Sequence, residues 1–133
     1  MESSAVLAGR LENDRAAIAT LNAAGRRVTS ALTWAEVARA VVRARCARRL
    51  DAQAEAVAIR DIGRLALTCE QVDVSDEILL RAGRPFPVEP VRTLDAIHLA
   101  TLDMLGEAPE RVLVVTRDAR VRANARALGY AVA

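Results

Sequence analysis

The chain has 133 residues, a formal net charge of +2 and a hydrophobic fraction of 53%, much of it alanine. This length fits a single domain, residues 1–133, with a sizeable core. Aromatic residues make up only 2% of the chain, which argues against nucleic-acid binding by base stacking. All 19 basic residues are arginine. Arginine suits phosphate partners, but a GC-rich genome produces the same bias, and this second interpretation is favoured.

Neither secretion nor membrane insertion is predicted. No apolar run approaches the roughly 20 residues that cross a bilayer, and no signal peptide pattern opens the chain. Cys46 and Cys69 stand alone, without a CxxC pair or a partner histidine, as expected in a reducing compartment. We therefore expect a cytoplasmic protein that does not contact membranes.

Hydrophobic periodicity predicts helices that alternate with short strands. Apolar residues at helical spacing predict helices over residues 7–24, 33–49, 51–66, 75–82, 94–105 and 119–128. Branched apolar runs predict strands over residues 27–32, 71–74, 111–116 and 130–132. The run over 111–116 is the most hydrophobic, which predicts burial on both faces, as in a parallel sheet. The alternation as a whole predicts an α/β fold with a parallel sheet.

Carboxylates stand at four points where a strand or loop runs into a helix: Glu2, Glu36, Asp95 and Asp118. Glu36 and Asp118 each follow a predicted strand, so both are expected at the same edge of a parallel sheet. Asp95 lies in the first turn of its helix and would reach that edge, and Glu2 precedes the first helix. Each acid also has a simpler explanation, because acids near a helix start stabilise the helix dipole or cap the helix.

Taken as a set, these carboxylates suit a hard divalent cation. Mg²⁺ and Mn²⁺ prefer oxygen ligands and keep several waters, so two to four carboxylates are enough to bind one. Crowded acids repel each other without such a cation. A centre of this kind suits phosphodiester hydrolysis, because the metal activates water and stabilises charge on the phosphate oxygens.

Four stretches, in order, resemble the acidic motifs of the PIN-domain family: residues 2–7, 33–37, 92–100 and 115–118, the last followed by 127–129. The size and the short loops are most similar to the VapC-type toxins of toxin–antitoxin pairs. The resemblance implies a PIN-like, doubly wound parallel sheet flanked by helices and a Mg²⁺- or Mn²⁺-dependent endoribonuclease that cuts RNA. It also implies a homodimer that a small VapB-like antitoxin neutralises.

The resemblance also implies roles for single residues. Carried over by position, Glu2, Glu36 and Asp95 would be the core metal ligands, and Asp118 would act as a fourth acid, directly or through water. Ser4 and Thr116 would be the hydroxyls that orient carboxylates and water. The reaction would be attack of water on an RNA phosphodiester.

Three further residues lie near these acids in the sequence. Arg39 and Arg43 follow Glu36 by three and seven positions and share its helix face. They would hold RNA phosphates, or alternatively pair with Glu36 or face solvent. His98 lies one turn after Asp95 and could bond to a carboxylate or act as an acid. A packed, hydrogen-bonded core residue is the favoured interpretation, because a lone histidine without a matched partner lacks the geometry of a catalytic triad.

The chain departs from the family pattern in two ways. The first acid is normally Asp, and Glu2 moves the carboxylate by about one C–C bond, whereas Mg²⁺ geometry is strict. The family also has a hydrophobic strand, central in the sheet, before that acid, where this sequence begins Met1-Glu2. We expect this first strand to be truncated, and a start site assigned too late is the favoured explanation. The alternative is a nuclease-inactive binding module that sequesters an antitoxin or serves as a dimer partner.

Overall fold

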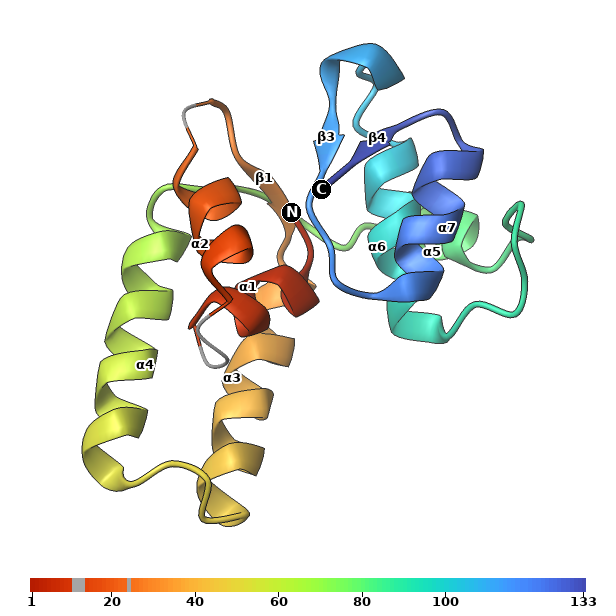
Figure 1. The fold of residues 1–133 in the computed structure, drawn as a ribbon. Helices are drawn as coiled ribbons and strands as arrows, with labels where there is room; N and C mark the ends of the chain where they lie inside the picture. Colours follow the sequence, from red (N-terminus) through yellow and green to blue (C-terminus); the bar gives the residue numbers. More distant parts are fainter. Residues whose placement is uncertain (11–13, 24) are drawn as a thin grey trace.

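The computed structural model describes residues 1–10, 14–23 and 25–133. The helices are α1 (Ser3–Arg10), α2 (Arg15–Asn22), α3 (Leu32–Cys46), α4 (Ala52–Ala66), α5 (Asp76–Ala82), α6 (Thr93–Asp103), the 3-10 helix η1 (Pro109–Arg111) and α7 (Ala119–Ala127). The strands are β1 (Val28–Ser30), β2 (Glu70–Val72), β3 (Leu113–Val114) and β4 (Ala131–Val132). The predicted α/β class is confirmed (Figure 1). No helix within the described residues is long and apolar enough to cross a bilayer.

The described strands form two separate parallel pairs, β1 with β2 and β3 with β4. The first residues of the chain lie between them (Figure 1). The Met1 amino group donates to the Val28 carbonyl at 2.9 Å. The Glu2 N–H donates to the Val115 carbonyl at 3.1 Å. These two residues therefore connect the pairs, and the predicted doubly wound sheet is present as two half-sheets.

The strand predicted over residues 111–116 is shorter and more exposed than expected. Only Leu113 and Val114 are paired, and the Leu113 side chain is 53% exposed. The prediction of burial on both faces is wrong here. Both faces of a strand are buried where helices pack on each side of a continuous sheet. Within the described residues β3 belongs to a two-stranded pair and has a partner along one edge alone, so it is not part of such a sheet.

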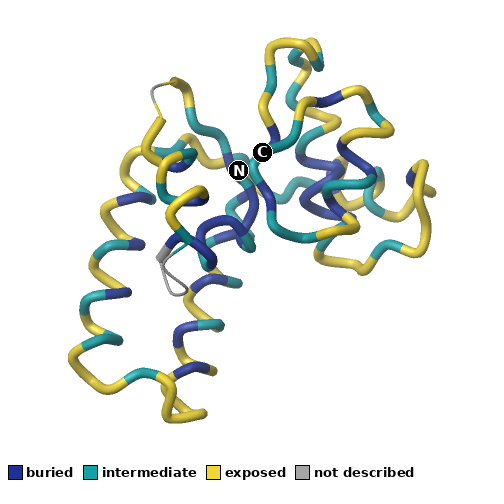
Figure 2. Tube along the Cα trace, in the orientation of Figure 1, coloured by how far each residue is buried: buried dark blue, intermediate teal, exposed yellow. Residues whose placement is uncertain are grey.

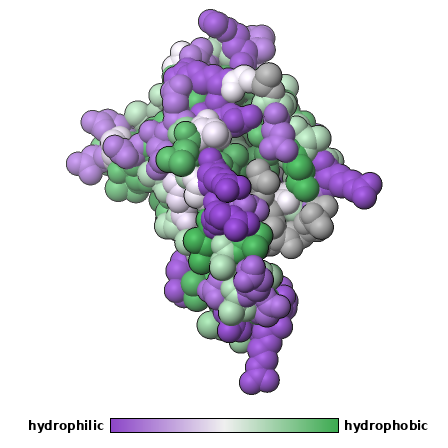
Figure 3. All heavy atoms as spheres, turned by 90° about the vertical axis from the view of Figure 1, so that its left-hand side faces the viewer, coloured by the Kyte–Doolittle hydropathy of each residue, from purple (hydrophilic) through white to green (hydrophobic). Residues whose placement is uncertain are grey.

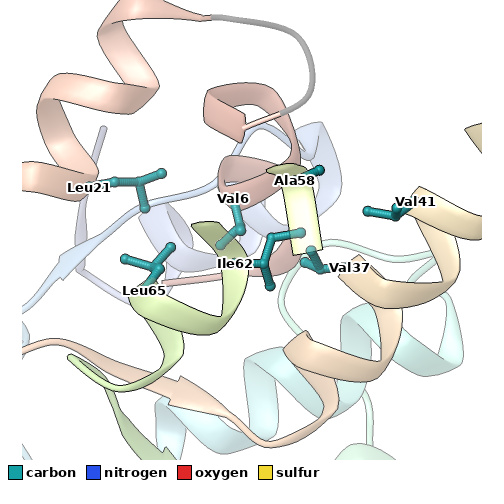
Figure 4. Close-up of a cluster of buried hydrophobic side chains, with 7 residues drawn as sticks. All are labelled: Val6, Leu21, Val37, Val41, Ala58, Ile62 and Leu65. Atoms are coloured by element: carbon teal, nitrogen blue, oxygen red, sulfur yellow. The ribbon is translucent and has the colours of Figure 1, made fainter. Parts of the chain in front are cut away.

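The apolar core is divided between the two halves of the molecule (Figure 2). The first cluster joins α1 to α4 and contains Val6, Leu21, Val37, Val41, Ala58, Ile62 and Leu65 (Figure 4). The second joins α5, α6 and α7 and contains Ile78, Phe86, Ala96, Ile97, Leu99, Ala100 and Val121. Both consist mainly of aliphatic side chains, as the scarcity of aromatic residues predicts.

The single helix predicted over residues 7–24 is wrong, because Asp14 begins a new helix. Its side chain accepts hydrogen bonds from Ala16 N at 2.9 Å and Ala17 N at 3.1 Å, and such a cap cannot lie in a helix interior. Leu11, one of the apolar positions behind the prediction, lies outside the described residues. The chain therefore folds α2 back against α1, and a Cβ added to Gly9 would lie 2.9 Å from Leu21 Cδ1.

Helix starts with a polar cap follow the prediction closely. Asp51 caps α4 through Ala54 N at 2.7 Å, and Ser75 caps α5 through Ile78 N at 3.4 Å. Helix α3 instead begins at Leu32, without a side-chain cap. Glu36 consequently lies beyond the first turn, where the helix dipole has little effect, so the dipole explanation for this acid fails.

Candidate metal centre

The Glu2 carboxylate is buried at the junction of the two half-sheets, where it is 7% exposed. Ser3 Oγ donates to its Oε1 at 2.6 Å, and Thr116 Oγ1 donates to its Oε2 at 2.8 Å. Ser4 adds a backbone N–H bond to Oε1 at 3.1 Å and a hydroxyl bond to Oε2. Both carboxylate oxygens are therefore held in place by the chain itself.

The hydroxyls of Ser4 and Thr116 also fix the segment that follows β3. Ser4 Oγ accepts from Arg117 N at 2.7 Å and from Asp118 N at 3.1 Å. Thr116 Oγ1 accepts from Asp118 N at 3.0 Å. These two hydroxyls therefore connect the start of α1 to the segment after β3. Ser4 and Arg117 are 113 residues apart in the sequence, so local sequence patterns do not predict this contact.

Glu36 and His98 form the second part of the site, from α3 and α6. His98 is buried, and its Nε2–H donates to Glu36 Oε2 at 2.5 Å. Desolvation acts to raise the pKa of Glu36, but the His98 hydrogen bond and charge, with help from Ser3 and Arg43, bring that pKa below its usual value. The carboxylate is therefore held in its ionised form. His98 is buried and hydrogen-bonded, as the favoured interpretation predicts, but its partner is a carboxylate, as the alternative interpretation predicts.

Asp95 lies one turn before His98 on α6, and its carboxylate is only partly satisfied. Its Oδ2 atom is buried and has no hydrogen-bond partner among the described residues. Burial raises the pKa of Asp95, and the negative charges of Asp118 and Glu2 raise it further. Asp118 and Glu2 are therefore close enough to Asp95 for their charges to act on its carboxyl group.

Asp118 serves as the cap of α7. Its Oδ1 accepts from Arg120 N at 2.7 Å and from Val121 N at 3.1 Å. The capping explanation offered by the sequence therefore applies to this acid. Its charge still reaches Asp95, so capping and membership of the acidic cluster are compatible.

One side-chain atom each from Glu2, Glu36 and His98 lies within 4.8 Å of the others. The carboxylate oxygens suit Mg²⁺ and Mn²⁺, whereas His98 Nε2 donates its hydrogen to Glu36 and therefore orients that carboxylate instead of binding the metal. The orphaned Asp95 oxygen and the mutual repulsion of the acids both indicate a missing positive charge. The residues present therefore fit a divalent cation.

Two members of this site were not predicted to belong to it. Ser3 was given no role, although its hydroxyl contacts Glu2. His98 was assigned to the core without a named partner, because Glu36 lies 62 residues away in the sequence. The adjacency of Ser3 to Glu2 was the one signal that could have identified the first of them.

The two predicted phosphate-binding arginines, Arg39 and Arg43, are exposed on α3. Neither forms an ion pair within the described residues, although the charge of Arg43 contributes to the low pKa of Glu36. Figure 3 shows hydrophilic side chains gathered around the lower end of the molecule, where α3 leads into α4. The exposed arginines of that segment are Arg45, Arg48 and Arg49.

Comparison with known proteins identifies the family of the chain. The family model described as PIN domain matches residues 3–127. Ribonuclease VapC46 of Mycobacterium tuberculosis (strain ATCC 25618 / H37Rv) is 43% identical over 107 residues, 80% of this chain and 72% of the relative. Ribonuclease VapC35 of Mycobacterium tuberculosis (strain CDC 1551 / Oshkosh) is 34% identical over 107 residues, 80% of this chain and 71% of the relative. No solved structure matches the chain. The chain therefore belongs to the PIN-domain family and is of the VapC type.

Proposed function

We propose that this protein is a Mg²⁺- or Mn²⁺-dependent endoribonuclease that hydrolyses RNA phosphodiester bonds. The observation that carries the proposal is the convergence of a Glu2 and a Glu36 carboxylate oxygen within 4.8 Å, near Asp95, whose buried Oδ2 has no hydrogen-bond partner among the described residues. Relatives that are 43% and 34% identical bear the name ribonuclease, which supports the same reaction class.

Glu2, Glu36, Asp95 and Asp118 would hold the cation. When bound, the metal would supply charge for the phosphate oxygens and lower the pKa of a water molecule. Thr116 and Ser4 keep the Glu2 carboxylate oriented, and His98 does the same for Glu36. Asp95 Oδ2, which has no hydrogen-bond partner in the described part of the chain, would accept the remaining contact from metal or water.

Arg39 and Arg43 would bind RNA phosphates next to this centre. Both side chains are exposed on the helix that carries Glu36. Arginine presents a planar fork that matches phosphate oxygens, and neither Arg39 nor Arg43 forms an ion pair within the described residues, which leaves both forks open to substrate. The contact would position RNA without selecting a base sequence.

Cleavage of a mixed RNA substrate tests the proposal directly. With Mg²⁺ or Mn²⁺ present, Glu36→Gln and Asp95→Asn should each lower the rate by about 10²-fold or more, because each removes a charge from the centre. Glu110→Gln, which changes an exposed acid in η1, is the matched control and should cleave at the parental rate. Parental rates in both site variants would refute the assignment.

One observation favours the alternative, a nuclease-inactive binding module. Both oxygens of Glu2 already accept hydrogen bonds, from Ser3, Ser4 and Thr116, and metal binding would have to displace some of them. Calorimetric titration with Mn²⁺ separates the two functions. Binding that is lost in Glu36→Gln supports the nuclease, whereas the absence of binding in the parent supports the inactive module.

We further propose a homodimer that a VapB-like antitoxin neutralises in the cytoplasm. The relation to the VapC ribonucleases supports this assembly. Light scattering of the purified protein measures its oligomeric state. Affinity capture of a small protein encoded beside the gene, followed by loss of RNA cleavage in that complex, would identify the antitoxin.

A further inference from the structure

The four acids of the metal centre would repel an RNA substrate as well as attract a cation. Four carboxylates carry more negative charge than one divalent cation neutralises, so phosphates near the centre need further positive charge beside them. Arg39 and Arg43 lie on α3, in the half of the molecule that carries Glu36. Asp95 and Asp118 lie at the starts of α6 and α7, in the other half (Figure 1). A substrate that passes the centre therefore also needs cations on the α6–α7 side.

The starts of α6 and α7 lie together and carry two arginines. Close to these starts, Ala96, Ile97 and Val121 pack in one apolar cluster. Arg92 immediately precedes α6, and Arg120 is the second residue of α7. Both arginines therefore lie at the end of the helix pair that holds the acids.

The charges of these two arginines reach the acidic centre. Burial raises the pKa of Asp95, and the charges of Asp118 and Glu2 raise it further. The charges of Arg120 and Arg92 partly oppose this rise, because they favour the ionised carboxylate. The Arg120 N–H also donates to Asp118 Oδ1 at 2.7 Å, which joins this residue directly to one of the acids.

The guanidinium groups of Arg92 and Arg120 are available to a ligand. Both residues are exposed, and neither forms an ion pair within the described residues. Two neighbouring arginines differ in this respect. Arg117 Nε donates to Asp14 Oδ2 at 2.9 Å, and Arg122 Nη2 donates to a backbone carbonyl at 3.1 Å. The latter two side chains therefore support the fold, whereas the former two do not.

Helix stability does not account for arginine at these two positions. The N-terminus of a helix carries partial positive charge, so a cation there is unfavourable. Arg92 is the N-cap residue of α6, and its side chain makes no capping hydrogen bond. Arg120 lies in the first turn of α7. A residue that opposes the local stability of a helix is expected where it serves a functional site.

We propose that Arg92 and Arg120 form a phosphate clamp on the α6–α7 side of the metal centre, which binds the RNA phosphate on one side of the scissile bond while Arg39 and Arg43 bind the phosphate on the other. This inference rests on the proposed ribonuclease function. Each guanidinium would hold phosphate oxygens through charge-assisted, bidentate hydrogen bonds. Contacts on both sides would fix the scissile phosphate against the acids and reduce the repulsion that it meets there.

The first test measures RNA binding with Ca²⁺ in place of Mg²⁺, so that a hard cation keeps its charge in the centre. Fluorescence anisotropy at several salt concentrations compares the parent with Arg92→Gln/Arg120→Gln. The double variant should bind about 10-fold more weakly, and its salt slope should fall by about 1.4, since each contact to a single strand contributes about 0.7. The matched control, Arg111→Gln/Arg126→Gln, removes two exposed arginines from η1 and the last turn of α7 and should bind like the parent.

The second test identifies the phosphate that each pair of arginines binds. In an RNA with one mapped cleavage site, a neutral methylphosphonate replaces the phosphate on either side of that site. Each replacement should raise KM about 5-fold or more in the parent, and it should add little in a variant that already lacks the arginines of that side. We expect one linkage to depend on Arg92 and Arg120 and the other on Arg39 and Arg43. A general defect in folding would affect both linkages alike.

Several results would overturn the phosphate clamp. Parental affinity and salt slope in Arg92→Gln/Arg120→Gln would do so, as would a loss equal to that of the control. The same holds if both linkages depended equally on Arg92 and Arg120, or if the double variant unfolded at a Tm more than about 5 °C below that of the parent. If the parent cleaved no RNA, the proposed function would fail, and the anisotropy measurement would still decide whether the clamp exists.

Discussion

The corner of the site around Glu2 and the corner around Asp95 hold their carboxylates in opposite ways. Both oxygens of Glu2 accept hydrogen bonds from neighbouring hydroxyls and a backbone N–H. Asp95 has a buried oxygen without a partner among the described residues, and its pKa is raised by burial and by Asp118 and Glu2. Glu2 therefore contributes to the fold as well as to the site. Asp95, by contrast, has a carboxylate that a bound cation would stabilise in its ionised form.

The largest effect is expected at Asp95. Asp95→Asn should lower RNA cleavage by about 10²-fold or more while raising the Tm of metal-free protein, because the substitution removes a charge that Asp118 and Glu2 repel. Cleavage assays and thermal unfolding in EDTA measure the two effects. A fall in Tm would show that the Asp95 carboxylate stabilises the fold, as the Glu2 carboxylate does, and the proposed difference between the two acids would then be wrong.

Glu2 should behave in the opposite way. Glu2→Ala should lower the free energy of unfolding by about 2–4 kcal/mol, since the buried donors on Ser3, Ser4 and Thr116 lose their acceptor. Urea denaturation measures this change. Glu70→Ala is the control, because it removes an exposed carboxylate whose pair with Arg26 is screened by solvent, so it should change the free energy of unfolding much less than Glu2→Ala does. Equal costs would contradict the assigned structural role.

His98 should tune the site through Glu36. His98→Ala removes the hydrogen bond to Glu36 Oε2 and should weaken Mn²⁺ binding about 10- to 100-fold. His98→Gln keeps an N–H donor and should recover part of the affinity. Isothermal titration calorimetry gives both values. If the two variants bound Mn²⁺ equally, the hydrogen bond would not be the cause of the loss.

The smallest effect is expected at the exposed arginines. Arg43→Gln should weaken RNA binding a few-fold and reduce its salt dependence by about one unit, as the loss of one phosphate contact predicts. The control is Arg60→Gln on α4, which changes another exposed arginine. Fluorescence anisotropy at several salt concentrations measures both. An unchanged salt slope for Arg43→Gln would place its side chain outside the RNA path.

Local patterns predicted much of the secondary structure because the signals that start and stop helices lie within a few residues. Asp51 and Ser75 cap helices where the sequence placed their starts. The helix predicted over residues 7–24 failed because Asp14 has two possible roles, and only packing of α2 against α1 decides in favour of the cap. Helix α3 was predicted to start with Thr33 as its cap, but it begins one residue earlier, at Leu32, and no side chain caps it.

The sequence by itself determined the family and the order of the acids, since each acid follows a strand or opens a helix and such positions gather at one edge of a parallel sheet. Only the tertiary structure decided which partners these acids have. The bonds from His98 to Glu36 and from Thr116 to Glu2 span 62 and 114 residues, and no local pattern encodes them.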